Sequence, residues 1–161
     1  MRSLAFVLRC ACSAAASYQL ALWLGLPVPV WASVSALVIA QDRWSETRVS
    51  LHERVRGTLL GVAVSLAVNI VAISLRLPAI VQLMVAVAVC AAVARAERGL
   101  RVCMWTCPIV LLSAHAGAQP AIVTGLLRAF EIMVGCFVGG VFHFLAERLL
   151  ALEFTRERER G

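Results

Sequence analysis

Charged residues are scarce in this chain, and lysine is absent altogether. Only 15% of the 161 residues are charged, whereas 61% are hydrophobic, and the mean hydropathy is positive. Soluble globular domains carry about 25% charged residues on average. The composition therefore excludes an ordinary soluble domain and favours a membrane protein whose surroundings are the lipid bilayer.

The residue patterns of common enzymes are also missing. Without lysine, the chain has no glycine-rich phosphate loop that ends in Lys, and it has neither a spaced metal-ligand cluster nor a set of Ser, His and carboxylate outside the apolar runs. The net charge of +6 does not indicate nucleic acid, because the arginines lie between apolar runs and form no surface stripe. We expect no enzyme activity, no cofactor, no metal and no nucleic-acid partner.

The six cysteines lie in or beside apolar segments, where a free thiol behaves as a small hydrophobic group. Cys103 and Cys107 are one helical turn apart, which is a spacing that a soft metal can use, but no second C-x-x-C accompanies them. We therefore expect no disulfide framework and assign both residues to packing.

Six apolar segments divide the chain. A helix that crosses the hydrocarbon needs about 20 apolar residues, so six crossings with short connections would use nearly all of residues 1–161. The predicted helices cover residues 4–26 (beginning at Leu4 or Ala11), 30–40, 57–75, 79–94, 102–116 and 128–150. We predict an all-α, polytopic membrane protein with about six transmembrane helices in a single domain.

The connections between these segments are polar or contain proline and glycine. Residues 42–56 carry seven charged side chains and are expected to form a helical extension in water or among headgroups, while Gly117 to Pro120 breaks the chain between two helices. A short charged tail, residues 151–161, follows the last helix. Because cytoplasmic flanks collect arginine, the arginine distribution places both termini in the cytoplasm and only Arg76 and Arg128 outside.

An internal repeat appears when the chain is compared with itself at an offset of 74 residues. Without a gap, residues 25–72 align with residues 99–146 and share eleven identities, among them Gly25 with Gly99, Trp31 with Trp105 and Gly61 with Gly135. Each unit, about 4–76 and about 78–150, holds three predicted helices. An odd number of crossings turns the second unit over, so we predict a 3+3 inverted repeat of the transporter kind.

Inverted-repeat transporters bind substrate near the midplane, often beside unusually short apolar segments at matched positions. The short segments here are 30–40 and 102–116, and each begins beside a matched tryptophan, Trp31 or Trp105. Those tryptophans are candidates for the site, or alternatively anchors at the membrane interface. We expect an anion to lie between segments 30–40, 57–75, 102–116 and 128–150.

Glycines four residues apart occur in both units. They are Gly57 with Gly61 and Gly135 with Gly139. Small residues at this spacing let helix backbones approach closely, so we interpret them as packing positions. The sequence leaves open whether they serve contacts within one subunit or between subunits.

Ionisable groups inside membrane segments are functional candidates because burying them in lipid is costly. The candidates for substrate or proton handling are Arg54, Asn69, Arg128, Glu131, His143 and Glu147. His143 aligns with Asn69 in the repeat, and Glu147 follows His143 by four residues on the same helix face, which suggests a proton-handling pair. Alternatively, His143 and Glu147 are a structural pair near a helix end that reaches water.

Arg128 and Glu131, three residues apart, can satisfy each other's charge at the outer end of the last helix. Alternatively, Arg128 or Arg54 holds a substrate carboxylate through its planar guanidinium group. His115, a lone histidine near the end of segment 102–116, is interpreted as a structural donor.

The run Trp31-Ala-Ser-Val-Ser-Ala-Leu-Val-Ile-Ala-Gln41, followed by Arg54-Val-Arg-Gly57-Thr58-Leu-Leu-Gly61, resembles the first conserved block of the fusaric acid resistance and aromatic acid exporter superfamily. The later run Arg128-Ala-Phe-Glu131-Ile-Met-Val-Gly135 is similar to the second block. The resemblance implies an inner-membrane, proton-driven exporter of aromatic carboxylic acids that often works with a periplasmic adaptor protein.

Larger members of that superfamily carry two such membrane halves and a cytoplasmic domain. One half suggests self-association, so we expect a homo-oligomer. Two hypotheses follow: the chain is an oligomeric exporter of small organic anions, or it is a non-transporting membrane subunit that assembles or stabilises a partner complex.

Overall fold

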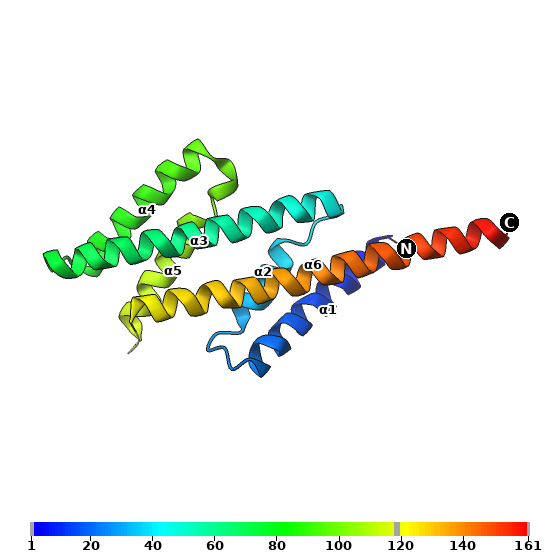
Figure 1. The fold of residues 1–161 in the computed structure, drawn as a ribbon, viewed down its shortest axis with the longest axis horizontal. Helices are drawn as coiled ribbons and strands as arrows, with labels where there is room; N and C mark the ends of the chain where they lie inside the picture. Colours follow the sequence, from blue (N-terminus) through cyan, green and yellow to red (C-terminus); the bar gives the residue numbers. More distant parts are fainter. Residues whose placement is uncertain (1, 118–119, 161) are drawn as a thin grey trace. The chain divides into compact units, whose positions relative to one another are not determined.

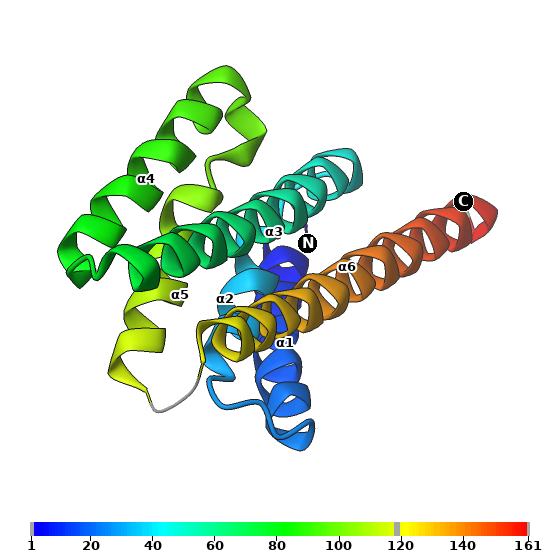
Figure 2. The same cartoon turned by 60° about the vertical axis from the view of Figure 1, so that its left-hand side comes forward.

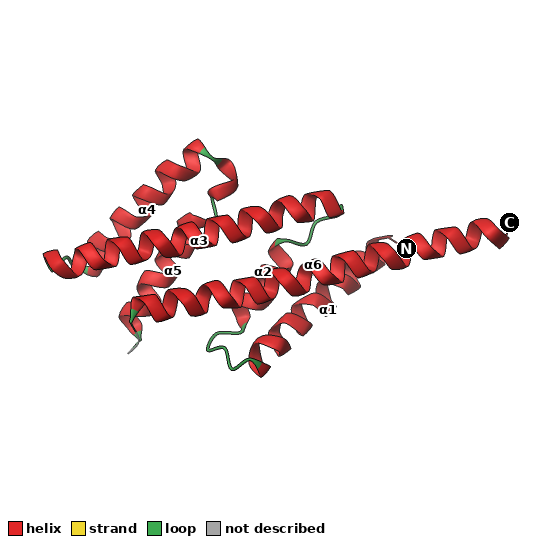
Figure 3. Ribbon diagram, viewed as in Figure 1, coloured by secondary structure: helices red, strands yellow, loops and turns green. Residues whose placement is uncertain are grey.

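The computed structural model describes residues 2–117 and 120–160, and every regular element in them is a helix (Figure 3). The elements, labelled in Figure 1, are α1 (Arg2–Trp23), α2 (Val30–Val38), α3 (Trp44–Leu75), α4 (Ala79–Ala96), η1 (Arg98–Leu100), α5 (Cys103–Ala116) and α6 (Ala121–Arg160). The predicted all-α class is confirmed for the described residues.

Four of these helices, not six, are long and apolar enough to cross a membrane by themselves. They are α1, α3, α4 and α6. With 9 and 14 residues, α2 and α5 fall below the roughly 20 residues that a crossing needs. Proline and glycine limit the length of both helices, because Pro27 and Pro29 precede α2 and Gly117 follows α5. The described residues thus contain four helices long enough to cross and two short ones, and six crossings remain a prediction.

Two helices are longer than the apolar pattern suggested. The charged stretch predicted as an extension is continuous with the next helix, so that α3 runs unbroken from Trp44 through 32 residues. Likewise, α6 begins at Ala121 and not at Arg128, because Pro120 is followed directly by apolar residues that continue a helix. Arg128 therefore lies about two turns inside α6, which corrects its predicted place at the helix end.

Part of two predicted segments lies outside the described residues. The break from Gly117 to Pro120 includes residues 118 and 119, which the structure does not describe. In the charged tail, the backbone of residues 151–160 continues α6 as a helix, but the side chains and residue 161 are outside the described part.

Helices α1 and α3 end in the same way. At the end of α1, the Gly25 N–H donates to the Leu22 carbonyl and the Leu26 N–H donates to the Ala21 carbonyl. This pattern needs a left-handed residue after the helix, and Gly25 has φ +68°. After α3 the same position is held by Arg76, with φ +52°. A non-glycine residue there carries a steric cost.

The chain divides into two compact units. The first contains residues 1–51 and 133–161, and the second contains residues 52–132. In the first unit, α1 packs against α2. The C-terminal part of α6 lies against α2 as well, because a side chain at Gly135 would collide with the Ala32 carbonyl and one at Gly139 would come within 3.0 Å of the Ala36 backbone.

The second unit contains α4, α5 and most of α3. Helix α4 packs against α5, and both helices are labelled in Figures 1 and 2. Helix α3 approaches α5 through Gly57 and Gly61, where an added Cβ would lie 2.6 Å from Val102 Cβ and 2.7 Å from Thr106 Cβ. The predicted close approach at all four glycines is present, and in this chain it joins helices of one subunit.

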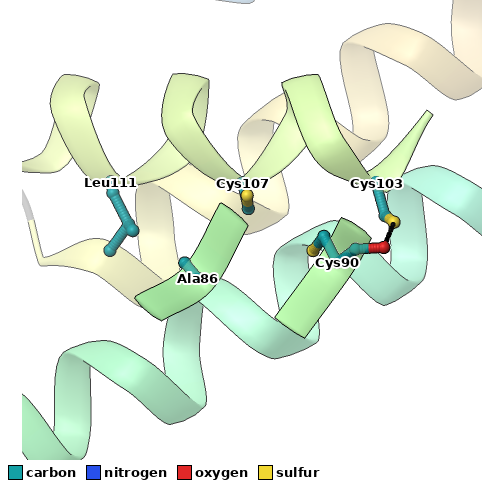
Figure 4. Packing of buried hydrophobic residues seen from close by; sticks show 5 residues of the cluster. All are labelled: Ala86, Cys90, Cys103, Cys107 and Leu111. Carbon is teal, nitrogen blue, oxygen red and sulfur yellow. Dashed lines mark hydrogen bonds between the residues drawn. The ribbon is translucent and has the colours of Figure 1, made fainter. Parts of the chain in front are cut away.

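The core of the second unit is rich in cysteine. Figure 4 shows Ala86 and Cys90 of α4 facing Cys103, Cys107 and Leu111 of α5, and all five are buried. The Cys103 thiol donates to the Cys90 carbonyl at 3.5 Å. Pro108 cannot donate to the Met104 carbonyl, and the Cys107 thiol does so instead at 3.8 Å. All six cysteines are free thiols, and these three are packing residues.

Candidate functional site

A buried polar cluster in the first unit centres on His143. Its side chain is 1% exposed on α6, and its Nδ1 atom lies 2.7 Å from the hydroxyl of Thr47, which is fully buried near the start of α3. The other ring nitrogen, Nε2, lies 3.6 Å from a carboxylate oxygen of Glu147, one turn along α6. His143 and Glu147 are therefore close together, as their four-residue spacing allows, and Thr47 of α3 is a third member of the cluster.

Glu147 joins this cluster to the start of α3. Its side chain is 48% exposed, and its carboxylate accepts a hydrogen bond of 3.3 Å from the backbone N–H of Trp44, the first residue of the helix. A carboxylate is stabilised at this position because the first N–H groups of a helix have no partners within the helix. The Trp44 ring also meets the His143 ring edge-on, with centroids 5.4 Å apart.

The cluster continues to α1 through the connection between α2 and α3. The Thr47 hydroxyl accepts the backbone N–H of Gln41 at 3.2 Å, and the Gln41 carbonyl accepts a hydrogen bond of 2.7 Å from Arg9. Hydrogen bonds thus link Arg9 of α1, the α2–α3 connection, Thr47 of α3 and His143 of α6. The half-exposed Glu147 carboxylate lies beyond the histidine, 3.6 Å from Nε2.

A second polar group lies in the other unit. On α6, Arg128 donates a 2.7 Å hydrogen bond to Glu131, and their side chains are 6% and 1% exposed. On α3, Arg54 and Thr58 are buried within the same unit. Two guanidinium groups and one carboxylate are therefore buried in the second unit, which gives a net positive charge among these three.

The remaining candidates are more exposed. Trp105 is 56% exposed, and Trp31 is half-buried, each in the first turn of its short helix. Asn69 is half-buried on α3, in contrast to its repeat partner His143. His115 is exposed and lies 2.7 Å from the Leu111 carbonyl in its own helix. Its predicted structural role fits this contact.

Sequence reasoning missed Thr47, Trp44, Gln41 and Arg9. Their partners lie up to 103 residues away in the chain, so no local spacing could have identified them. Thr47 also lies within a charged stretch that looked fully solvated. Among the residues that the structure describes, no three His, Cys, Asp or Glu side chains are arranged to hold a metal ion.

Comparison with known proteins agrees with the resemblance noted from the sequence. No curated protein and no solved structure gives a significant match. The model of the fusaric acid resistance protein-like family matches residues 14–142, which is well over half of the chain and includes α2, α3, α4 and α5 entirely. The chain belongs to the fusaric acid resistance protein-like family of membrane proteins.

Proposed function

We propose that this chain exports small organic anions, in particular aromatic carboxylates, across the bacterial inner membrane. The family suggests membrane transport of the efflux kind, and the four long apolar helices fit a membrane location. The observation that carries the choice of an anion is the buried charge of the second unit. Its two arginines and one glutamate favour a ligand with a single negative charge.

Within that unit, Arg54 is our preferred ligand for the substrate carboxylate. Arg54 is buried on α3, and the planar fork of its guanidinium group suits a carboxylate. Thr58 lies one turn further along the same face of α3 and is buried too, so its hydroxyl can add a hydrogen bond. The Arg128–Glu131 pair then supports the site without binding substrate.

An internal repeat supports the proposal of a transporter. Gly61 lies against Thr106, and Gly135 lies against Ala32. Both glycines and both of their contacts are matched by the 74-residue offset of the sequence repeat. The packing of α1 on α2 corresponds in the same way to that of α4 on α5. We infer a 3+3 repeat of residues 4–76 and 78–150, in which three crossings in the first repeat invert the second.

The proposed topology has six crossings, with both termini in the cytoplasm. Helices α2 and α5 would cover about 14 and 21 Å of a bilayer core about 30 Å thick, and their connecting segments would complete the crossing. This topology leaves most arginines on the cytoplasmic side. We further propose a homo-oligomer and a periplasmic adaptor as partner. The oligomer must use surfaces other than the four glycines, since these face α2 and α5.

His143 is the proposed proton carrier. Its buried ring lies one turn from the half-exposed Glu147, which can exchange protons with water. Substitution His143→Gln should preserve folding but remove the dependence of efflux on a proton gradient. Unchanged efflux across the pH range would assign His143 to structure.

The test of the function is efflux of labelled benzoate from proteoliposomes that contain only this chain, with and without a proton gradient. Arg54→Gln is expected to abolish efflux and Arg54→Lys to reduce it. Arg56→Gln is the matched control, because Arg56 is two residues away, 60% exposed and paired with Glu97 at the surface. Folding of each variant is checked by circular dichroism and by size-exclusion chromatography.

Two results would contradict the proposal. If Arg54→Gln and Arg56→Gln transport equally well, the anion is not held by Arg54. If the unmodified chain gives no efflux under any gradient, the alternative of a non-transporting subunit is favoured.

A further inference from the structure

The two ring nitrogens of His143 face groups of opposite hydrogen-bonding character. Nε2 faces the Glu147 carboxylate at 3.6 Å, and Nδ1 faces the Thr47 hydroxyl at 2.7 Å. A carboxylate only accepts hydrogen bonds, whereas a hydroxyl can donate one and accept two. The surroundings of the ring can therefore determine which nitrogen carries the hydrogen.

The Glu147 side favours a hydrogen on Nε2. With a bare Nε2, two lone pairs would face each other across 3.6 Å beside a negative charge, which is unfavourable. With Nε2–H, the bond dipole points toward the carboxylate. The same carboxylate is held in place by the Trp44 N–H.

The Thr47 side favours a bare Nδ1. The hydroxyl oxygen already accepts the backbone N–H of Gln41 at 3.2 Å, so its own hydrogen is free to point elsewhere. A buried hydroxyl hydrogen needs an acceptor, and Nδ1 lies 2.7 Å away. Both contacts of the ring thus favour the same tautomer.

We propose that Thr47 is a positioning residue that holds His143 in the neutral form with its hydrogen on Nε2, and so couples protonation of this histidine to the α2–α3 connection. A second proton can enter the ring only at Nδ1. The Thr47 hydroxyl must then turn its hydrogen away and accept from Nδ1–H as well as from Gln41. Protonation therefore reverses the Thr47–His143 hydrogen bond and gives the oxygen that accepts the Gln41 N–H a second donor.

Charged groups from two helices act on the ring. The Glu147 carboxylate of α6 lies 3.6 Å from Nε2 and attracts a protonated ring, whereas the positive charge of Arg9 of α1, bound to the Gln41 carbonyl, repels one. The groups that contact it from α3, Thr47 and Trp44, are uncharged. Arg9 also holds the Gln41 carbonyl at 2.7 Å, so the charge that opposes protonation is attached to the same connection. A movement of this connection away from α6 would weaken both the Thr47 hydrogen bond that selects the tautomer and the repulsion between Arg9 and a protonated ring.

The tautomer is measured directly by magic-angle-spinning NMR of the full chain in lipid bilayers, with ¹⁵N and ¹³C labels in histidine. The chain has three histidines, His52, His115 and His143, and the His143→Gln spectrum identifies the signal of interest. At neutral pH we expect one His143 signal with the hydrogen on Nε2. A hydrogen on Nδ1, or an even mixture of the two tautomers, in the unmodified chain would overturn the proposal without any variant.

Two substitutions at Thr47 separate the hydroxyl from the shape of the side chain. Thr47→Ser keeps the hydroxyl and should keep the tautomer. Thr47→Val keeps the shape, and it should lower the ratio of Nε2–H to Nδ1–H by about fivefold, the factor that one hydrogen bond of about 1 kcal/mol sustains. An unchanged ratio in Thr47→Val would show that Thr47 does not select the tautomer.

The role of the Thr47–His143 hydrogen bond in transport rests on the proposed function. In proteoliposomes, Thr47→Val should flatten the pH dependence of efflux, whereas Thr47→Ser should retain it. A chain that shows the expected tautomer but no efflux would refute only the transport function. Efflux that is identical in Thr47→Val and in the unmodified chain at every pH would refute the coupling.

Discussion

Replacing Gly135 by alanine should separate a close helix contact from the ordinary preferences of a helix. Gly135 lies inside α6, where an alanine normally stabilises a helix by about 0.5–1 kcal/mol relative to glycine. At this position, however, the added methyl group would collide with the backbone carbonyl of Ala32 on α2. A backbone atom cannot move aside as a flexible side chain can, so the two helices must separate.

The chain provides a control in the same helix. At Gly140 an added Cβ would lie 3.6 Å from the end of the Leu51 side chain, which is an ordinary van der Waals contact. Gly140→Ala should therefore stabilise the protein by about 0.5–1 kcal/mol. Overpacking of a tight contact costs about 1–3 kcal/mol, and Gly135→Ala should fall at the upper end and destabilise by about 2 kcal/mol net.

Reversible unfolding in mixed micelles, with increasing SDS and detection by circular dichroism, measures both free energies. Gly135→Ala should unfold at a lower SDS fraction than the unmodified chain, and Gly140→Ala at a higher one. If the two variants are equally stable, Gly135 does not contact α2 as described. A loss of dimer mass in Gly135→Ala with unchanged monomer stability would place the glycine between subunits.

Three further variants test local features by the same unfolding measurement. Glu131→Gln should destabilise by about 3 kcal/mol or more, because it leaves the Arg128 guanidinium buried without its ion-pair partner. The double replacement Arg128→Met, Glu131→Leu should recover most of this loss, and a double variant as unstable as Glu131→Gln would contradict the reasoning. Arg76→Gly should stabilise by about 1 kcal/mol, since φ +52° suits glycine. A destabilised Arg76→Gly would mean that the arginine side chain contributes more than its backbone strain costs.

The sequence predicts the helical class and most element positions because apolar length and proline act locally. Pro78 and Arg76 mark the end of α3 correctly, and the two short segments are short in the structure. The start of α6 was wrong because Arg128 looked like a helix end. A buried partner three residues later lets this charge lie inside the helix, and the two-turn segment before it is apolar.

The contacts between distant segments are harder to predict from the sequence. The glycine spacing predicted close approach but not which helix comes near, because the 3.6-residue period describes one helix face only. Similarly, His143 and Glu147 could be paired from their spacing, whereas Thr47 comes from 96 residues away. The character of the site depends on that third residue, and only the folded chain brings it to the histidine.

In the proposed topology the two sequence repeats, residues 4–76 and 78–150, cross the membrane in opposite orientations. This topology is tested most directly by sidedness reporters inserted at Arg43 and at Gly117, two positions that the 74-residue offset matches. Each position is fused to two reporters in turn, one that is active only in the cytoplasm and one that is active only in the periplasm. The reporter that is active shows on which side of the membrane the position lies. The proposed topology places Arg43 in the cytoplasm and Gly117 in the periplasm. Both positions on the same side would contradict it.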